Sequence, residues 1–379
     1  MAVGFIFEAN PYHFGHRFLI KKAQELYPND PLVMVTSTSF TMRGETSLYD
    51  KFSKTNIYLN EGIDLVFELP ISKTLQSADY FGYNAVKILN LLKVDKLVIG
   101  CETDDITIID YLFKTINSDE YKQKFKTNLS LNLSYKQTFN KTLEDLKVEE
   151  SLIKLFSKPN MTLAFQYYQA IKNLNSSMNL VLVKRTNDYY GENSSSDSLI
   201  VSSSFIRKKL LNEEKICQYL PYESFKISLT AVQNNLRLLF IFQTMNLSYL
   251  NDEEGIYNYI VKNGDFSKDL TSFVDELSNK KYSKSRLRRV ILWIILNGNL
   301  EKNDDSIYLR LLGLSKKGQT YLGFLPKEIK QLIFSSPNEL KEINKDLKLE
   351  LKATKLYDLI TNNNLYINEY KLPIKKEGI

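Results

Sequence analysis

Short apolar runs alternate with amphipathic segments over the first two hundred residues. Five runs are almost continuously hydrophobic, as is typical of strands buried on both faces of a sheet: 3–8, 32–36, 65–69, 96–100 and 180–184. The segments between them carry apolar residues at helical spacing: 17–26, 48–60, 75–92 and 161–172. The alternation predicts βαβ units, and therefore a parallel sheet with helices on both faces.

The pattern changes after residue 211. Helical spacing dominates there, and we expect helices at 229–245, 253–262, 269–277, 285–297, 306–312, 326–332 and 347–360. Because 379 residues is more than one hydrophobic core usually spans, we expect two domains. The first is an α/β domain over 1–211 and the second a mostly α-helical domain over 212–379. The polar stretch 118–150 is expected to form helix and loop that cover the sheet.

The composition changes this picture little. Hydrophobic residues make up 43% and charged residues 25% of the chain, as in an ordinary globular protein. Two cysteines, Cys101 and Cys217, are too few for a disulfide scaffold or a thiolate zinc site. The N-terminus does not resemble a signal peptide, and no apolar stretch approaches the ~18 residues of a membrane span. We therefore expect a soluble, cytoplasmic protein.

The positive charge is concentrated in one segment. The net charge is +6, and "SNKKYSKSRLRRVILWIIL" (278–296) carries six cations just before an apolar helix: Lys280, Lys281, Lys284, Arg286, Arg288 and Arg289. A solvated helix start is the simplest interpretation. Cations at a helix N-terminus oppose the helix dipole, however, unless an anion lies nearby. We therefore predict that Lys281, Lys284, Arg286 and Arg289 contact a phosphate backbone.

The two histidines of the chain, His13 and His16, both lie in "ANPYHFGH" (9–16), directly after the first predicted strand. At the carboxyl end of a parallel strand such a turn is well placed to bind a ligand. Gly15 lets the backbone approach an anion, the following helix offers free amides, and two imidazoles donate to phosphate oxygens. A zinc site with Glu8 as third ligand, or purely structural histidines, are the alternatives.

A second phosphate-binding pattern lies about 190 residues later, in "IVSSSFIRKKL" (200–210). Ser202, Ser203 and Ser204 open a predicted helix, and Arg207 lies one turn into it. Hydroxyls and free amides at a helix N-terminus bind phosphate, although a serine there is also a common N-cap.

The strand followed by N-P-x-H-x-G-H, with the later Ser-rich turn, resembles the HxGH nucleotidylyltransferase superfamily. Further stretches are similar to the tRNA(Met) cytidine acetate ligase family: "STSFTMRGETSLYDKFSK" (37–54), "GIDLVFELPISKTLQSADYFGYNAVKIL" (62–89), "DKLVIGCET" (95–103), "SKPNMTLAFQYYQAI" (157–171), "VKR" (183–185), "GQTYL" (318–322) and "ELKATKLYDLI" (350–360). The resemblance implies a Rossmann-like nucleotidylyltransferase sheet followed by a helical domain. It also implies an enzyme that activates acetate with ATP as acetyl-adenylate. The acetyl group then passes to N4 of the wobble cytidine of elongator tRNA(Met).

The resemblance implies roles for individual residues. Those expected to bind ATP, with Mg²⁺ bridging its phosphates, are Ile6, Phe7, Glu8, Asn10, His13, Gly15, His16, Gly100, Asn160, Arg185, Ser203, Ser204 and Arg207. His13 and His16 are also expected to be catalytic, and Arg43 and Lys51 are expected to neutralise phosphate or steer the carboxylate. Acetate and tRNA are the expected partners, with no protein partner and no resident metal ion.

The sequence departs from the family pattern at several positions, namely Ala9, Phe14, Met161 and residues 187–190. None of these departures removes a phosphate-binding group. Two other functions therefore stay open from the sequence. One is an adenylyltransferase that acts on a small phosphorylated metabolite, and the other is a paralogue that binds nucleotide or RNA without turnover.

Overall fold

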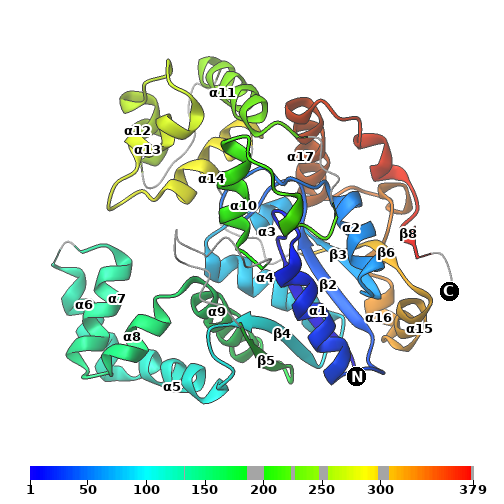
Figure 1. Ribbon diagram of the computed structural model, residues 1–379, viewed down its shortest axis with the longest axis horizontal. Helices are drawn as coiled ribbons and strands as arrows, with labels where there is room; N and C mark the ends of the chain where they lie inside the picture. The colour runs from blue at the N-terminus through cyan, green and yellow to red at the C-terminus, as the bar shows by residue number, and fades with distance from the viewer. Residues whose placement is uncertain (132, 186–199, 223–226, 247–254, 298–306, 377–379) are drawn as a thin grey trace.

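The computed structural model describes residues 1–131, 133–185, 200–222, 227–246, 255–297 and 307–376. These residues form an eight-stranded sheet in the order β5–β4–β1–β2–β3–β6–β7, with β8 paired to β6 (Figure 1). The strands are β1 (Val3–Phe7), β2 (Leu32–Ser37), β3 (Leu65–Leu69), β4 (Lys96–Cys101), β5 (Asn179–Lys184), β6 (Leu309–Leu314), β7 (Ile333–Phe334) and β8 (Ile374–Lys375).

All five strands predicted in the first half are confirmed. β1 runs parallel to β2 and β4, and β3 and β5 extend the parallel array on either side. The strands are short and apolar because both of their faces are covered. Phe5 and Phe7 of β1 pack against α1 and α2 on one face, while Ile6 packs toward α4 and α9 on the other.

Helices account for most of the remaining described residues. They are α1 (Phe14–Leu26), α2 (Lys51–Asn60), α3 (Ile71–Thr74), α4 (Ala78–Leu91), α5 (Ile106–Asn117), α6 (Asp119–Leu129), α7 (Tyr135–Asp145), α8 (Glu150–Phe156), α9 (Pro159–Asn173), α10 (Ser203–Leu211), α11 (Leu229–Asn246), α12 (Ile256–Asn263), α13 (Leu270–Leu277), α14 (Lys284–Ile295), α15 (Lys316–Phe324), α16 (Lys327–Lys330) and α17 (Lys345–Thr361). Short 3₁₀ turns lie at Cys217–Tyr219, Pro337–Glu339 and Tyr366–Tyr370.

Helix boundaries follow local capping. The helix predicted over 48–60 begins only at Lys51, because the Asp50 side chain accepts the amides of Phe52 and Ser53. The helix predicted over 75–92 is two helices, α3 and α4, since the chain leaves helical geometry at Leu75. The first part of the helix predicted over 253–262 lies outside the described residues, and α12 covers the rest.

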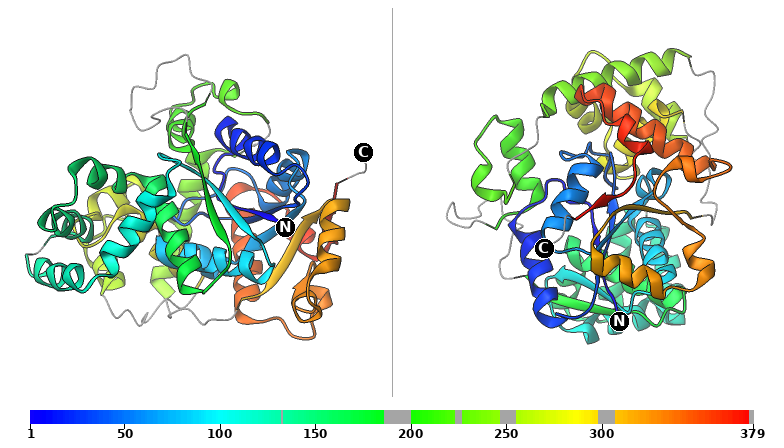
Figure 2. Two further views of the ribbon diagram at one scale, coloured as in Figure 1. Left: turned by 90° about the horizontal axis from the view of Figure 1, so that it is seen from below. Right: turned by 90° about the vertical axis from the view of Figure 1, so that its right-hand side faces the viewer.

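The second half of the chain is mostly helical, as expected, but it also adds strands to the sheet. The prediction of a helix over 306–312 is wrong, because β6 occupies this stretch and runs antiparallel to β3. β7 and β8 then pair with β6 (Figure 2). A domain boundary at residue 212 stays a prediction, and the last seventy residues return to the sheet of the first half.

The helices of the second half pack on the loop and short helix that follow β2 and β3. Trp293 of α14 donates its indole N–H to the Leu75 carbonyl at 3.1 Å. Gly44 has a positive φ of 71°, and a Cβ there would lie 2.7 Å from the Arg289 amide nitrogen. The loop carrying Gly44 therefore lies directly against α14.

The polar stretch 118–150 forms α6 and α7, which pack against each other as an antiparallel hairpin. Together with α5 and α8 the hairpin projects from the side of the molecule opposite to β6–β8 (Figures 1 and 2). Among the described residues, no helix is long and apolar enough to cross a membrane.

Candidate active site

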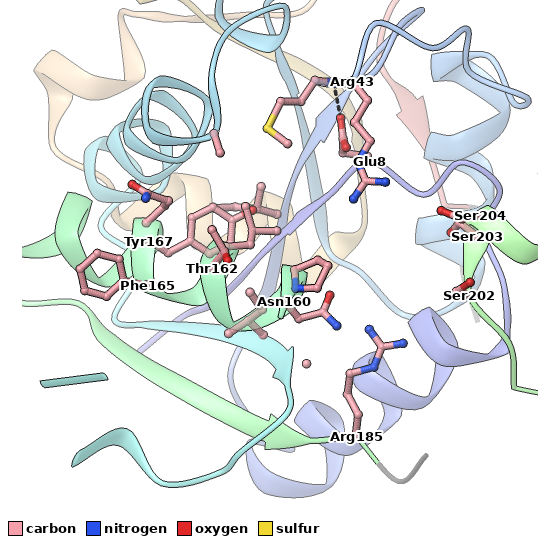
Figure 3. Close-up of a pocket in the computed structure, with 18 of the residues that line it drawn as sticks. Glu8, Arg43, Asn160, Thr162, Phe165, Tyr167, Arg185, Ser202, Ser203 and Ser204 are labelled. Carbon is pink, nitrogen blue, oxygen red and sulfur yellow. Dashed lines mark hydrogen bonds between the residues drawn. The ribbon is translucent and has the colours of Figure 1, made fainter. Parts of the chain in front are cut away.

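A cavity of about 1370 Å³ opens at the carboxyl edge of the parallel strands. Its walls come from the turn after β1, the loop 41–45, the ends of β4 and β5, and the first turns of α9 and α10 (Figure 3). Ligands of open parallel sheets bind at this edge, because the strand order reverses there and helix N-termini point toward it. The sequence-predicted residues Ile6, Phe7, Glu8, Asn10, His13, Gly15, His16, Arg43, Gly100, Asn160, Arg185, Ser203, Ser204 and Arg207 all line it.

The histidine pair starts α1. Nδ1 of His13 accepts the Gly15 amide at 3.0 Å, and the His13 amide donates to Nδ1 of His16 at 3.2 Å. Because both Nδ1 atoms accept, the ring hydrogen of each imidazole lies on Nε2. A Cβ at Gly15 would lie 2.7 Å from Cε1 of His13, so glycine is required beneath this ring.

Both imidazoles are neutral at physiological pH. Burial, and after it the positive charges of Arg185 and Lys54, lower the pKa of His16 to about 3. Burial, the neighbouring His16 and the charges of two arginines lower the pKa of His13 well below its ordinary value. The two rings therefore act as hydrogen-bond donors through Nε2, not as fixed positive charges.

The two sequence motifs, 190 residues apart, adjoin in space. The Ser203 hydroxyl donates to the Pro11 carbonyl at 3.3 Å, and Arg207 donates to the Asn10 carbonyl at 2.6 Å. Arg207 also pairs with Glu45 at 3.0 Å and donates to the Ser204 hydroxyl at 3.3 Å. The N-terminus of α10 therefore lies beside the histidine turn, and the N-termini of both helices border one cavity.

The Asn10 side chain connects the histidine turn to the loop after β2. Its amide donates to the Thr46 carbonyl at 3.1 Å, and its oxygen accepts the Leu48 amide at 2.8 Å. Asn10 thereby holds the loop after β2 against the histidine turn. Its second amide N–H is not used by these bonds, and the predicted contact of Asn10 with ATP stays a prediction.

The opposite wall contains Gly100, Asn160 and Arg185. Gly100 lies in β4, and the Arg185 amide extends the β4–β5 ladder by donating to the Cys101 carbonyl at 2.9 Å. Asn160, in the first turn of α9, donates to Glu102 at 3.1 Å. Figure 3 shows Asn160 and Arg185 directed into the same space.

A carboxyl and a phenol, Glu8 and Tyr167, line the same cavity. Glu8 accepts the Met42 amide at 2.5 Å, and burial is the main cause that raises the pKa of its carboxyl. The Tyr167 hydroxyl is buried, lies close enough to feel the Glu8 charge, and has no hydrogen-bond partner among the described residues. Burial raises the pKa of Tyr167 well above its ordinary value, so this hydroxyl is a donor. Tyr167 was not predicted from the sequence, because its spacing is that of a core residue of a helix.

The two predicted cations of the stretch 37–54 differ in placement. Arg43 is exposed and lines the cavity near Glu8 (Figure 3). Lys51 does not: its ammonium is 2% exposed and pairs with Glu68, Glu350 and Glu369 at 3.0, 3.1 and 2.7 Å. The prediction that Lys51 contacts phosphate or carboxylate substrate is therefore corrected, because the ion cluster of α2, β3 and α17 encloses it.

The basic segment 280–289 borders the cavity through α14. Arg289 donates to the Met42 carbonyl at 3.1 Å, and Lys284 pairs with Asp275 at 2.8 Å. Lys281 and Arg286 flank the Tyr282 ring, at 5.0 and 5.7 Å from its centroid. Arg289 therefore ties the segment to the loop that lines the cavity, and the RNA contact predicted for these four cations stays a prediction.

A family model described as HIGH Nucleotidyl Transferase matches residues 1–371. The chain is 31% identical over 392 residues to the tRNA(Met) cytidine acetate ligase of Listeria welshimeri, which covers 98% of both chains. It belongs to the tRNA(Met) cytidine acetate ligase family. The protein of the same name from Staphylococcus haemolyticus is 28% identical, again over 98% of both chains.

Solved structures agree with this family membership at the level of the fold. The apo crystal structure of Thermotoga maritima TmcAL superposes with a TM-score of 0.83 at 21% identity, and covers 99% of both chains. The structure of that protein bound with alpha-thio ATP superposes with a TM-score of 0.79 at 22% identity. The parallel nucleotidylyltransferase sheet and the helical second half are thereby confirmed as a known architecture.

Of the positions at which this member of the family departs from the sequence pattern, Ala9 lines the cavity, whereas Phe14 and Met161 do not. Met161 is fully buried, with its sulfur 3.6 Å from Sγ of Cys101. Phe14 stacks under the Arg17 guanidinium, 5.6 Å from the ring centroid. Residues 187–190 lie outside the described residues. Within the part of the chain that the structure describes, no three His, Cys, Asp or Glu side chains gather to hold a metal ion.

Proposed function

We propose that this chain activates acetate with ATP as acetyl-adenylate and transfers the acetyl group to N4 of the wobble cytidine of elongator tRNA(Met). The observation that carries the proposal is the junction of the two motifs. The Ser203–Pro11 and Arg207–Asn10 hydrogen bonds bring two helix N-termini and two neutral imidazole donors to one cavity. Relatives that match this chain over 98% of its length are named tRNA(Met) cytidine acetate ligase, which supports the proposal.

In the first step the acetate carboxylate attacks the α-phosphate of ATP and pyrophosphate leaves. The Nε2–H groups of His13 and His16 donate to the oxygens on which negative charge grows. Neutral donors suit this task, because they stabilise the developing charge without forming a tight ion pair with ground-state ATP. Arg185 and the backbone amides at the N-terminus of α10 would bind the other, negatively charged phosphate oxygens.

Mg²⁺ would enter together with ATP. The described cavity residues offer single carboxylates and no acidic cluster, which fits a cation held mainly by phosphate oxygens and water. Its contribution would be to neutralise phosphate charge.

In the second step the cytidine N4 amine attacks the acetyl carbonyl, and AMP leaves. The amine must lose a proton, and Glu8 is the carboxylate of the cavity centre with a raised pKa. A glutamate also matches the hydrogen-bond pattern of the cytosine amino group, which is a donor. The Tyr167 hydroxyl, which has no hydrogen-bond partner among the described residues and lies within range of the Glu8 charge, would donate to the carbonyl oxygen as it becomes negative.

Acetate-dependent exchange of pyrophosphate into ATP by the purified protein tests the first step. Exchange that requires acetate, with other small carboxylates weaker, supports the adenylation chemistry. Measurable ATP binding without exchange for any carboxylate would favour the non-catalytic paralogue. AMP transfer to a phosphorylated metabolite instead would favour the small-molecule adenylyltransferase.

A further inference from the structure

The cavity extends well beyond the phosphate-binding end. Single ligand pockets usually measure about 300–1,000 Å³, and this cavity, at about 1370 Å³, exceeds that range. Its far wall is built by the α6–α7 hairpin, which was expected only to cover the sheet. The function argued so far uses no residue of that hairpin.

Four aromatic rings form a continuous ladder through the hairpin and line this part of the cavity: Phe139, Tyr121, Phe125 and Tyr135. The ring centroids of Tyr121 and Phe139 lie 6.3 Å apart, those of Tyr121 and Phe125 5.6 Å apart, and those of Phe125 and Tyr135 5.6 Å apart. Tyr121 is buried, whereas Tyr135, at the outer end, is 74% exposed. The inner rings hold the two helices together, but Tyr135 adds little to that core and offers its ring to solvent at the cavity.

Lysines lie around the ladder. From residue 121 to residue 141 the chain carries five lysines and no aspartate or glutamate, although Asp119 and Asp145, just outside this stretch, pair with Lys122 and Lys141. Lys136, next to Tyr135, lines the cavity. The other side of the cavity is bordered by the basic segment 280–289, through the Arg289–Met42 hydrogen bond and the contact of Gly44 with α14. Asp79, at the start of α4, is near enough to both Tyr135 and Arg289 for its charge to act on each. The aromatic ladder therefore lines one part of the cavity, and the loop 41–45, against which the basic segment packs, lines another.

An exposed ring among cations beside a nucleotide cavity fits an unpaired nucleobase. Proteins recognise single-stranded RNA by stacking splayed bases on aromatic rings while cations neutralise the backbone. We propose that Tyr135, supported by Phe125, is a stacking platform for an unpaired base of the RNA acceptor, next to the base that enters the cavity. This inference rests on the proposed function and names the part of the molecule that receives the RNA strand.

The test compares Tyr135→Ala with Tyr111→Ala in binding a fluorescent RNA stem-loop with an unpaired loop. Tyr111 is a matched control, since it is 45% exposed on α5 and does not line the cavity. Tyr135→Ala is expected to raise the Kd for the stem-loop by roughly 5- to 100-fold, and Tyr135→Trp to preserve it. The slope of log Kd against log salt concentration should stay unchanged, because no cation is removed.

A blunt duplex of the same stem is the second control, and its affinity should not change in Tyr135→Ala because it offers no base to stack. The proposal is overturned if the stem-loop Kd of Tyr135→Ala stays within about twofold of that of Tyr111→Ala. It is also overturned if duplex binding weakens as much as stem-loop binding. Acetate-dependent exchange by the unmodified protein tests the proposed function separately, so the two failures are distinguishable.

Discussion

Replacing His16 by asparagine separates the two tasks of this imidazole. Nδ1 of His16 accepts the His13 amide at 3.2 Å and so completes the cap of α1, while Nε2–H lines the cavity as a donor. Asparagine places its side-chain oxygen close to the Nδ1 position and has no group at the Nε2 position. His16→Asn therefore keeps the cap and removes the donor, whereas His16→Ala removes both.

The expected effects differ in size and kind. Loss of one donor to a developing negative charge typically costs 10²–10³ in rate, or roughly 2.7–4 kcal/mol, so both variants should lose acetate-dependent exchange by about that factor. Loss of a cap costs about 0.5–2 kcal/mol of folding stability, so only His16→Ala should unfold at lower urea concentration. Exchange kinetics and urea denaturation measure the two effects independently.

The result that would refute this reasoning is a His16→Asn protein with normal exchange and normal stability. The imidazole would then be a helix cap and nothing more. His16→Gln provides a further check, since its amide nitrogen reaches the Nε2 position and should recover part of the lost rate.

Three further predictions concern the same structure. Glu8→Gln keeps an acceptor for the Met42 amide but cannot take a proton. We therefore expect ATP–pyrophosphate exchange to persist, while the rate of acetyl transfer to tRNA falls by about 10²–10⁴. Equal loss of both activities would place Glu8 in the ATP site alone. Lys51→Met removes one cation from a cluster with three buried carboxylates, so we expect the free energy of unfolding, measured in urea, to fall by about 3–5 kcal/mol. Lys22→Met, at an exposed ion pair, should lower it by less than about 1 kcal/mol. Similar losses in the two variants would contradict the ion cluster. The folded pKa of His16 is about 3 against an ordinary 6.5, and that of His13 is also lowered, so the unfolded chain binds more protons between these values. The free energy of unfolding should therefore decrease as the pH falls from about 6.5 toward 3, and less steeply in the double variant His13→Asn/His16→Asn; identical slopes would show that the histidines are not buried as neutral groups.

The sequence predicted the parallel sheet well because its signal is local. Strands covered on both faces are continuous apolar runs, and all five in the first half appear where expected. The helix prediction for 306–312 was wrong because the structure there depends on residues far away in the sequence. A short apolar run fits a helix or a strand equally, and the choice of β6 depends on the open edge of β3, about 240 residues earlier.

The candidate site could be predicted where its residue types are rare in the chain or form a distinctive motif. Two histidines in one turn, and serines before an arginine, identified the two motifs that the fold brings together. The role predicted for Lys51 was wrong because its ion-pair partner Glu350 lies 299 residues away in the sequence. The sequence around Lys51 does not indicate a carboxylate cluster. Tyr167 was missed because its spacing is that of a core residue, and only the fold shows that it lines the cavity.

The most direct test of the central claim is the transfer of labelled acetate to RNA. The purified protein, ATP, Mg²⁺ and labelled acetate are incubated with bulk tRNA, and the nucleosides of the digested RNA are separated by mass. The proposed function predicts one labelled nucleoside, N4-acetylcytidine, formed only when ATP is present. ATP-dependent release of pyrophosphate with no label in any nucleoside would contradict it, and would leave an acetate-activating enzyme with a different acceptor.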